Sequence, residues 1–131
     1  MNKFNDRQKE TFDGVVEVSH ENGQLKQKGN YKDGKQNGLY ESFDENGQLE
    51  HRGNYKNGAE DGLWEEFDES GQLKHRGNYK NGALHGLWET FYLSNSNPFI
   101  LQGPIKTRGN YKNGELIGSV IYFDENGQLK R

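Results

Sequence analysis

The chain has 131 residues, enough for one domain, and its 17 basic and 20 acidic residues give a formal net charge of -3. Because the charges are interspersed and no basic block appears, composition excludes a typical nucleic-acid-binding protein. The absence of cysteine excludes disulfides and thiolate metal sites and fits a reducing compartment. The N-terminus carries no apolar signal segment and no stretch is long enough to span a bilayer, so we expect a cytoplasmic protein.

Apolar residues are scarce, at 29% of the chain, which is a value typical of disordered proteins. Two observations favour an ordered structure instead: 12% of the residues are aromatic, and the apolar positions recur in register. We therefore expect a thin sheet in which each unit buries a modest area.

The first residues, 1–13, contain Phe4 and Phe12 but none of the repeated phrases that follow. We predict either an N-terminal arm or a partial cap strand here. The repeat domain is predicted over residues 14–131.

Two short phrases recur through that domain. Gly-Asn-Tyr-Lys occupies residues 29–32, 53–56, 77–80 and 109–112. Glu-x-Gly-Gln-Leu occupies residues 21–25, 45–49, 69–73 and 125–129. The first three copies of each phrase are 24 residues apart, and self-similarity at such a period indicates a repeat protein.

One unit, residues 63–80, predicts a β-hairpin, because apolar and polar residues alternate on both sides of a Glu-Ser-Gly break. A three-residue loop that ends in Gly71 suits a type I turn followed by a left-handed glycine. The predicted register pairs Phe67 with Leu73, Glu66 with Lys74, Glu65 with His75, Trp64 with Arg76 and Leu63 with Gly77.

This register predicts two distinct surfaces, one with Phe67 and Leu73, the other with Trp64 opposite Arg76. The second hairpin is expected to repeat it by pairing Phe43 with Leu49, Glu41 with His51, Tyr40 with Arg52 and Leu39 with Gly53. The predicted fold is all-β: a single elongated antiparallel β-meander of about five 24-residue hairpin repeats, with about ten strands.

One hairpin departs from the pattern, because residues 92–103 form a long insert where its sister hairpin has a short turn. The insert contains Phe99, Ile100 and Leu101, the longest purely apolar run in the protein. Either this run folds back over the sheet or lengthens the hairpin, or it forms a contact site, because insertions in repeat arrays often lie on the binding face.

No feature predicts catalysis. His51 and His75 hold equivalent positions in neighbouring hairpins, but residues two strands apart lie about 10 Å from each other, too far to share one metal ion. We favour cross-strand pairing of these histidines with Glu41 and Glu65. No nucleophile elbow, phosphate loop or singular pair of carboxylates is present. We predict no enzyme activity, no metal and no cofactor.

A stripe of aromatic and basic residues is the stronger functional candidate, because Trp, Tyr and Arg are enriched at binding hot spots. Its members are Tyr40, Trp64, Trp88, Arg52, Arg76 and Arg108. Each pair either braces its own hairpin or contacts a partner, and the two roles are compatible.

The phrase Tyr-Lys-Asn-Gly-x-x-x-Gly-Leu-Trp-Glu-x-Phe-x-x-x-Gly-x-Leu, clearest at residues 55–73, resembles the MORN-repeat variant family of bacterial proteins. The resemblance extends over residues 14–131, and its matching positions are structural. It implies a protein-binding module, since family members are often described as antitoxins, while related MORN repeats are associated with membranes and scaffolding.

We therefore expect a non-enzymatic module that binds a protein partner, such as an antitoxin or immunity protein that neutralises a toxin. The alternative is a membrane-associated or scaffolding protein, although the near-equal charges disfavour a membrane. We expect no nucleic-acid partner and either a monomer or an edge-paired homo-oligomer. The predicted contact residues are those of the aromatic and basic stripe together with Phe99, Ile100 and Leu101.

Overall fold

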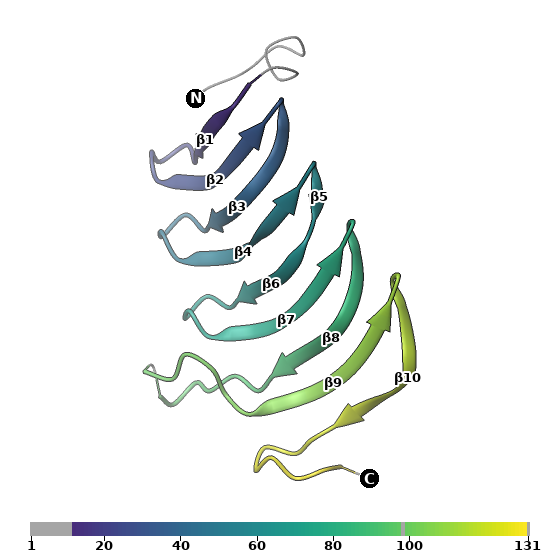
Figure 1. Ribbon diagram of the computed structural model, residues 1–131. Helices are drawn as coiled ribbons and strands as arrows, with labels where there is room; N and C mark the ends of the chain where they lie inside the picture. The colour runs from purple at the N-terminus through teal and green to yellow at the C-terminus, as the bar shows by residue number, and fades with distance from the viewer. Residues whose placement is uncertain (1–11, 98, 131) are drawn as a thin grey trace.

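The computed structural model describes residues 12–97 and 99–130. These residues form one ten-stranded antiparallel sheet in meander order and contain no helix, which confirms the predicted fold class (Figure 1). The part of the chain described here accordingly contains no helix long and apolar enough to cross a membrane. The prediction of an arm or cap strand falls almost entirely on residues 1–11, outside the described ones.

The sheet places each strand beside the next one along the chain, except that the short β5 pairs only with β4. The strands are β1 (Gly14–Ser19), β2 (Leu25–Lys32), β3 (Lys35–Phe43), β4 (Leu49–Lys56), β5 (Ala59–Glu60), β6 (Gly62–Phe67), β7 (Leu73–Lys80), β8 (Ala83–Phe91), β9 (Ile105–Lys112) and β10 (Glu115–Tyr122).

The turn between β6 and β7 has the predicted conformation. The Asp68 amide donates to the Gln72 carbonyl over 2.8 Å, and the Gly71 amide donates to the Asp68 carbonyl over 3.0 Å. Gly71 has φ of 89°, the left-handed value that a residue with a Cβ resists. The turn chemistry could therefore be predicted from the residues alone.

The turns at the opposite ends of the strands are also tight. Between β4 and β5, Asn57 and Gly58 have φ of 52° and 86°, and Lys56 pairs with Ala59. Positive φ at both central residues defines a type I′ turn, whose twist matches that of the strands. This turn repeats at Asp33-Gly34, Asn81-Gly82 and Asn113-Gly114.

The predicted register is correct next to the first turn and wrong beyond it. Phe67 pairs with Leu73 as expected, but a β-bulge follows. The observed pairs are then Glu66 with His75, Glu65 with Arg76, Trp64 with Gly77 and Leu63 with Asn78. Lys74 is the extra residue of the bulge, and it moves every later pair by one position.

The second hairpin carries the same bulge and requires the same correction. Phe43 pairs with Leu49 as predicted. The other pairs are Ser42 with His51, Glu41 with Arg52, Tyr40 with Gly53 and Leu39 with Asn54. The predicted pairing of Tyr40 with Arg52 and of Glu41 with His51 is therefore wrong.

The bulge separates the two halves of the predicted stripe. Since paired residues share a face and successive residues alternate, Trp64 lies on one face of the sheet and Arg76 on the other. We call the side of Tyr40, Trp64 and Trp88 the aromatic face. The opposite side, with Arg52, Arg76 and Arg108, is the charged face.

The glycine of each of the first three Gly-Asn-Tyr-Lys phrases faces an aromatic ring of the following strand, whereas Gly109 faces Leu116 and Val120. Side-chain atoms placed on Gly53 would run into the indole of Trp64, and on Gly77 into that of Trp88. The Trp64 indole Nε1 donates to the Asn54 carbonyl over 3.0 Å, which fixes the ring across β4. The glycines therefore permit contact between rings and backbone.

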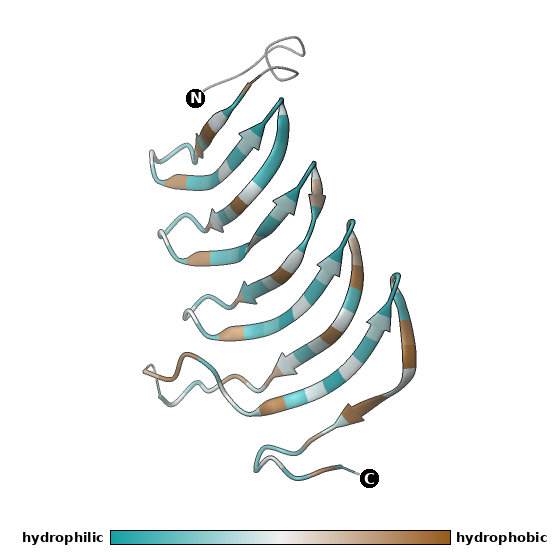
Figure 2. Cartoon of the chain, in the orientation of Figure 1, coloured by the Kyte–Doolittle hydropathy of each residue, from teal (hydrophilic) through white to brown (hydrophobic). Residues whose placement is uncertain are grey.

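The sheet has little buried apolar volume, as the composition predicts. Among the residues described, only two hydrophobic side chains are buried, Leu73 and Phe91. Figure 2 shows hydrophobic positions as short bands on most strands, with a longer band on β10. Stability consequently depends on contacts between neighbouring units, as expected for a repeat array.

We predict that Gly53→Ala lowers the free energy of unfolding by about 1–3 kcal/mol, because the new methyl group would displace the Trp64 indole. Urea unfolding followed by circular dichroism measures this change. Gly29→Ala is the matched control, because the nearest side-chain atom, Tyr40 Cδ1, is 3.4 Å from the added Cβ. Equal losses in the two variants would contradict the role given to the indole.

Candidate functional site

The aromatic face carries a continuous series of stacked rings. Tyr40 and Tyr55 meet edge to face with centroids 5.6 Å apart, and Tyr55 meets Trp64 at 5.1 Å. Trp64 then contacts Tyr79 at 6.4 Å. Partial burial raises the pKa of Tyr55 and of Tyr79, and the nearby Glu60 carboxylate raises both further. The series joins two neighbouring hairpins, β3–β4 and β6–β7, into one surface.

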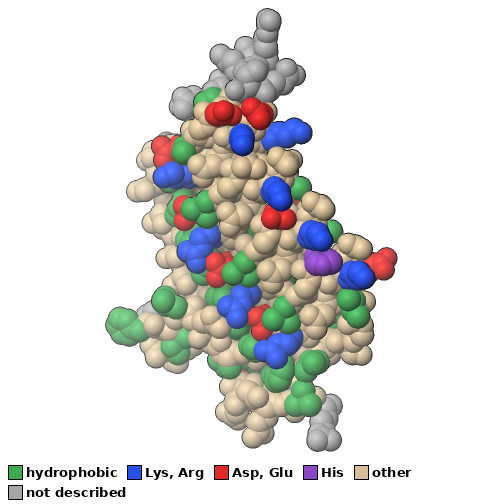
Figure 3. Space-filling view, viewed as in Figure 1, with side chains coloured by type: hydrophobic (Ala, Val, Ile, Leu, Met, Phe, Trp, Pro, Cys, Tyr) green, Lys and Arg blue, Asp and Glu red, His purple; other side chains and the backbone are tan. Residues whose placement is uncertain are grey.

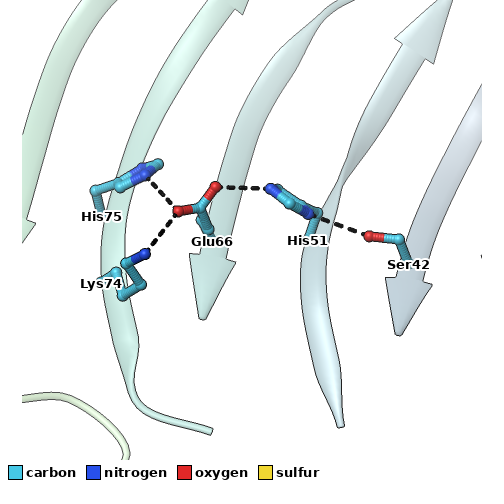
Figure 4. A network of polar contacts seen from close by, with 5 residues as sticks. All are labelled: Ser42, His51, Glu66, Lys74 and His75. Atoms are coloured by element: carbon cyan, nitrogen blue, oxygen red, sulfur yellow. Dashed lines mark hydrogen bonds and ion pairs between the residues drawn. The ribbon is translucent and has the colours of Figure 1, made fainter. Parts of the chain in front are cut away.

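A polar network lies beside these rings on the same face (Figure 4). The Glu66 carboxylate accepts a hydrogen bond from His51 Nε2 at 2.7 Å and from His75 Nε2 at 3.0 Å. Lys74 Nζ forms an ion pair with the same carboxylate at 3.2 Å. His51 Nδ1 lies 3.2 Å from the Ser42 hydroxyl, so a neutral His51 that donates to Glu66 would accept from Ser42.

This network corrects the predicted partners of the histidines. Both His51 and His75 bind Glu66, and neither binds the expected Glu41 or Glu65. Partial burial raises the pKa of Glu66, but hydrogen bonds from His51 and Lys74 and the charges of the histidines outweigh it, and the net pKa is lowered. In the described chain, no group of three or more His, Cys, Asp or Glu residues could hold a metal ion.

The charged face carries one row of alternating charges across the sheet. Figure 3 shows blue and red side chains alternating from strand to strand on this face. Paired in register, the row consists of Glu17, Lys28, Glu41, Arg52, Glu65, Arg76, Glu89 and Arg108, and it ends at Ile121 on β10. Opposite charges meet at every step of the row before Ile121, which stabilises the pairing of the strands.

The three arginines of the predicted stripe are engaged within this row. Arg52 binds Glu65 at 2.8 Å, while Arg76 and Arg108 bind opposite oxygens of Glu89 at 2.9 and 3.2 Å. Glu89 is only 3% exposed, and two guanidinium groups compensate its buried charge.

Each arginine also lies over the ring of a phenylalanine in the next hairpin along the chain. Arg52 is 5.5 Å from the Phe67 centroid, Arg76 is 5.3 Å from Phe91, and Arg108 is 5.7 Å from Phe123. The predicted stripe of Trp beside Arg is thus replaced by a structural stripe of Arg over Phe. This geometry assigns the arginines a bracing role between units.

The insert between β8 and β9 projects from the edge of the array formed by the turns (Figure 1). Phe99 is 89% exposed and Leu101 is 74% exposed, while Ile100 is partly covered. The apolar run therefore does not fold back to cover the sheet with these two side chains. Instead, it presents them to solvent at the tip of the insert.

The base of the insert is fixed to the preceding hairpin. The Gln72 side chain donates to the Ser94 carbonyl over 2.6 Å and accepts from the Ser94 amide over 2.8 Å. The Leu73 amide donates to the Leu101 carbonyl over 2.9 Å. These bonds hold the apolar tip in one position relative to the sheet.

The insert also adjoins the aromatic face. Leu93, near the start of the insert, lines one hollow together with His51, Glu66 and Lys74. A second hollow, lined in part by Trp64 and Trp88, shares His51 and Glu66 with the first. The insert therefore borders the aromatic face through Leu93, while Phe99, Ile100 and Leu101 line neither hollow and the arginines lie on the opposite face.

Comparison with known families gives four matches to the MORN repeat variant model, at residues 12–33, 36–57, 60–81 and 116–131. Together the matches cover more than half of the chain. The segment between the third and fourth matches holds the insert, yet it folds into the same hairpin, β8 and β9. A search of curated proteins found no match.

We predict that Glu66→Gln destabilises the protein near neutral pH and that this difference disappears in acid. The folded-state pKa of Glu66 is lowered, so its ionised form stabilises the fold above the unfolded pKa of about 4.3. That contribution is lost as the pH falls through the lower, folded pKa.

Urea unfolding of both proteins between about pH 7 and pH 2 measures this dependence. Glu69→Gln is the control, because Glu69 is exposed and forms no ion pair within the described residues. A difference between Glu66→Gln and the unmodified protein that stays constant with pH would refute the assignment.

Proposed function

The chain belongs to the MORN repeat variant family, and from this membership together with the exposed insert we propose that it neutralises a toxin by binding it directly. Repeats of this family are generally protein-binding and typically non-catalytic. The proposed role is that of an antitoxin or immunity protein, acting in the cytoplasm.

The observation that carries the proposal is the apolar tip of the insert. Phe99 and Leu101 expose large side chains, although hydrogen bonds at the insert's base hold the segment in place. Burial of such side chains in a partner gains about 25 cal/mol per Å² of apolar area. A fixed tip also loses little conformational freedom on binding, which favours affinity.

Charge supports the choice of partner. The net charge of -3 is small but acidic, and it favours approach to a cationic protein. The arginines of the charged face are already neutralised by Glu65 and Glu89, so they add little free positive charge. A cationic toxin such as a nuclease fits this surface better than an anionic lipid membrane does.

We predict that the double variant Phe99→Ser/Leu101→Ser binds the toxin at least tenfold more weakly without loss of stability, because both side chains are exposed in the free protein. The candidate toxin is the product of the neighbouring gene. Titration calorimetry with the purified product gives the affinity, and co-expression in growing cells shows whether the chain relieves toxicity.

Leu63→Ser is the matched control, because Leu63 is 43% exposed on the charged face. Unchanged affinity in the double variant would move the contact away from the insert. A neighbouring product that is neither toxic nor bound would remove the antitoxin role.

A second candidate function is self-association as a scaffold, and the sequence of β10 favours it. Leu116, Ile117, Ile121 and Tyr122 are exposed large apolar residues on this strand. Figure 2 shows β10 with the longest hydrophobic band of the sheet. In the row of alternating charges, Ile121 of β10 takes the position at which the equivalent strands carry glutamate. The row therefore ends without a carboxylate that an arginine of an added strand could bind. Among the described residues, β10 pairs as a strand only with β9. The Lys130 amide donates to the Tyr122 carbonyl over 2.8 Å and covers the end of the outer edge, while the rest of that edge is open to another strand.

The direction of the strands indicates how two copies would meet. β1 and β10 lie at opposite ends of a nine-strand meander path and run in the same direction. A copy added by translation would therefore pair in parallel, whereas two copies of β10 related by a two-fold axis pair antiparallel. The two-fold arrangement also places apolar residues against apolar residues.

For this candidate we expect the unmodified chain to form a dimer and Ile117→Lys/Ile121→Lys to be monomeric, because charge on an edge strand opposes pairing. Light scattering coupled to size exclusion measures both masses. Leu39→Lys is the control, with a similarly exposed leucine on the charged face away from the edge. A monomeric unmodified chain at high concentration would remove self-association.

A further inference from the structure

The aromatic face contains a hollow of about 230 Å³ over the hairpin of β6 and β7, which reaches His51 on β4 and Trp88 on β8. Trp64, Tyr79 and Trp88 contribute aromatic rings to its lining, and Glu60 contributes a carboxylate. Trp88 leans over Gly77 and forms one wall, held against His75 with centroids 4.7 Å apart. Trp64 and Tyr79 form another, with centroids 6.4 Å apart.

Glu60 differs from the other acidic residues of this region, because it has no counter-ion among the residues that the structure describes. Glu65, Glu66 and Glu89 each bind at least one basic side chain. Glu60 forms no ion pair and no side-chain hydrogen bond with any residue that the structure describes. It pairs in register with Tyr55, and its charge reaches the phenol groups of Tyr55 and Tyr79.

Glu60 is also singular within the repeats. The residues at equivalent positions opposite the tyrosine of each Gly-Asn-Tyr-Lys phrase are Gln36, Glu60, Leu84 and Leu116. Only one of these is charged. The carboxylate of Glu60 is therefore not a repeated feature of the hairpins, whereas the glutamates of the charged face recur from one hairpin to the next.

We propose that this hollow binds the guanidinium group of an arginine side chain presented by a protein partner. A planar cation gains from stacking on Trp and Tyr rings, and Glu60 supplies the missing opposite charge. Arginine fits better than lysine, because its guanidinium both stacks on rings and binds a carboxylate through two parallel hydrogen bonds.

This inference rests on the proposed function, since it names the chemistry that the protein partner would present to the aromatic face. It agrees with a cationic partner and requires no contact with the insert. The hollow and the first hollow beside Leu93 share His51 and Glu66, so one partner could occupy both. The arginine would then anchor a contact that continues to the apolar tip.

The test uses the full chain and N-acetyl-arginine amide as the probe. Trp64 and Trp88 are the only two tryptophans, so their indole N–H signals report on the hollow in an NMR titration. We expect both signals to shift in a saturable manner. N-acetyl-lysine amide is expected to bind more weakly, because its ammonium does not stack as a plane.

Glu60→Gln is expected to weaken binding of the arginine probe about fivefold, the upper range for an exposed ion pair. Glu115→Gln is the matched control: it changes the net charge equally, but Glu115 is exposed on β10 and absent from the lining of the hollow. Circular dichroism establishes that each variant keeps the sheet.

Three outcomes would overturn the inference: no shift of either indole signal up to the solubility of the probe, equal binding by Glu60→Gln, or equal binding of the two amides. Since the titration contains no partner protein, such a failure leaves the insert-mediated function intact. Unchanged toxin affinity of Phe99→Ser/Leu101→Ser together with normal arginine binding is the converse case, in which the insert-mediated function fails and the inference stands, so the two hypotheses are separable.

Discussion

Contact between an indole ring and the bare backbone of a neighbouring strand is the constraint on which the structure depends. Trp64 covers Gly53, and Trp88 covers Gly77, at positions where a Cβ would collide with the ring. A thin sheet has no second layer to cover its backbone, so the indole rings cover the backbone instead. Each hairpin therefore needs the glycine of the hairpin before it, so the units are stable only as an array.

On the charged face, neighbouring hairpins of the thin sheet are held together by different contacts. Arg52 and Arg76 lie over phenylalanine rings of the next hairpin while they bind glutamates of that hairpin. Ring contact and ion pairing are thus combined in one side chain, whose guanidinium carbon lies over the ring. Glu89 binds Arg76 and Arg108 together, which links three consecutive strands. Low apolar content is compatible with order because charged side chains perform part of the packing.

Much of the fold could be predicted from the sequence, because local chemistry determines it. Gly71 requires a left-handed conformation, and the alternation around it requires strands, so the hairpin and the meander follow. The bulge could not be predicted in this way. Pairing Glu66 with Lys74 or with His75 gives the carboxylate a basic partner in either case, and the residues on one strand do not reveal which neighbour is skipped.

The candidate site shows the same limit for a physical reason. Trp64 and Arg76 were predicted to share a face, since an aromatic ring beside a guanidinium is favourable. The structure pairs Trp64 with Gly77 instead. Glycine has no side chain, so its chemistry does not indicate this contact in the sequence. The exposed insert was recognisable because it interrupts the period. Glu60 departs from the repeat too, and the 24-residue spacing from Gln36 and to Leu84 marks these positions as equivalent in the sequence; only the structure shows that the Glu60 carboxylate lines the hollow.

Departures from the repeat are therefore where specific recognition is expected. Positions that recur are already occupied by contacts between units, as Trp64 is with Gly53 and Arg76 with Glu89. The features that are not committed to contacts between repeat units are those that occur once, Glu60 and the insert. Both adjoin the aromatic face. A surface composed only of repeated positions would offer the same contact several times over. Two singular features joined by shared hollows define one place and one orientation for a partner, which a uniform sheet cannot do.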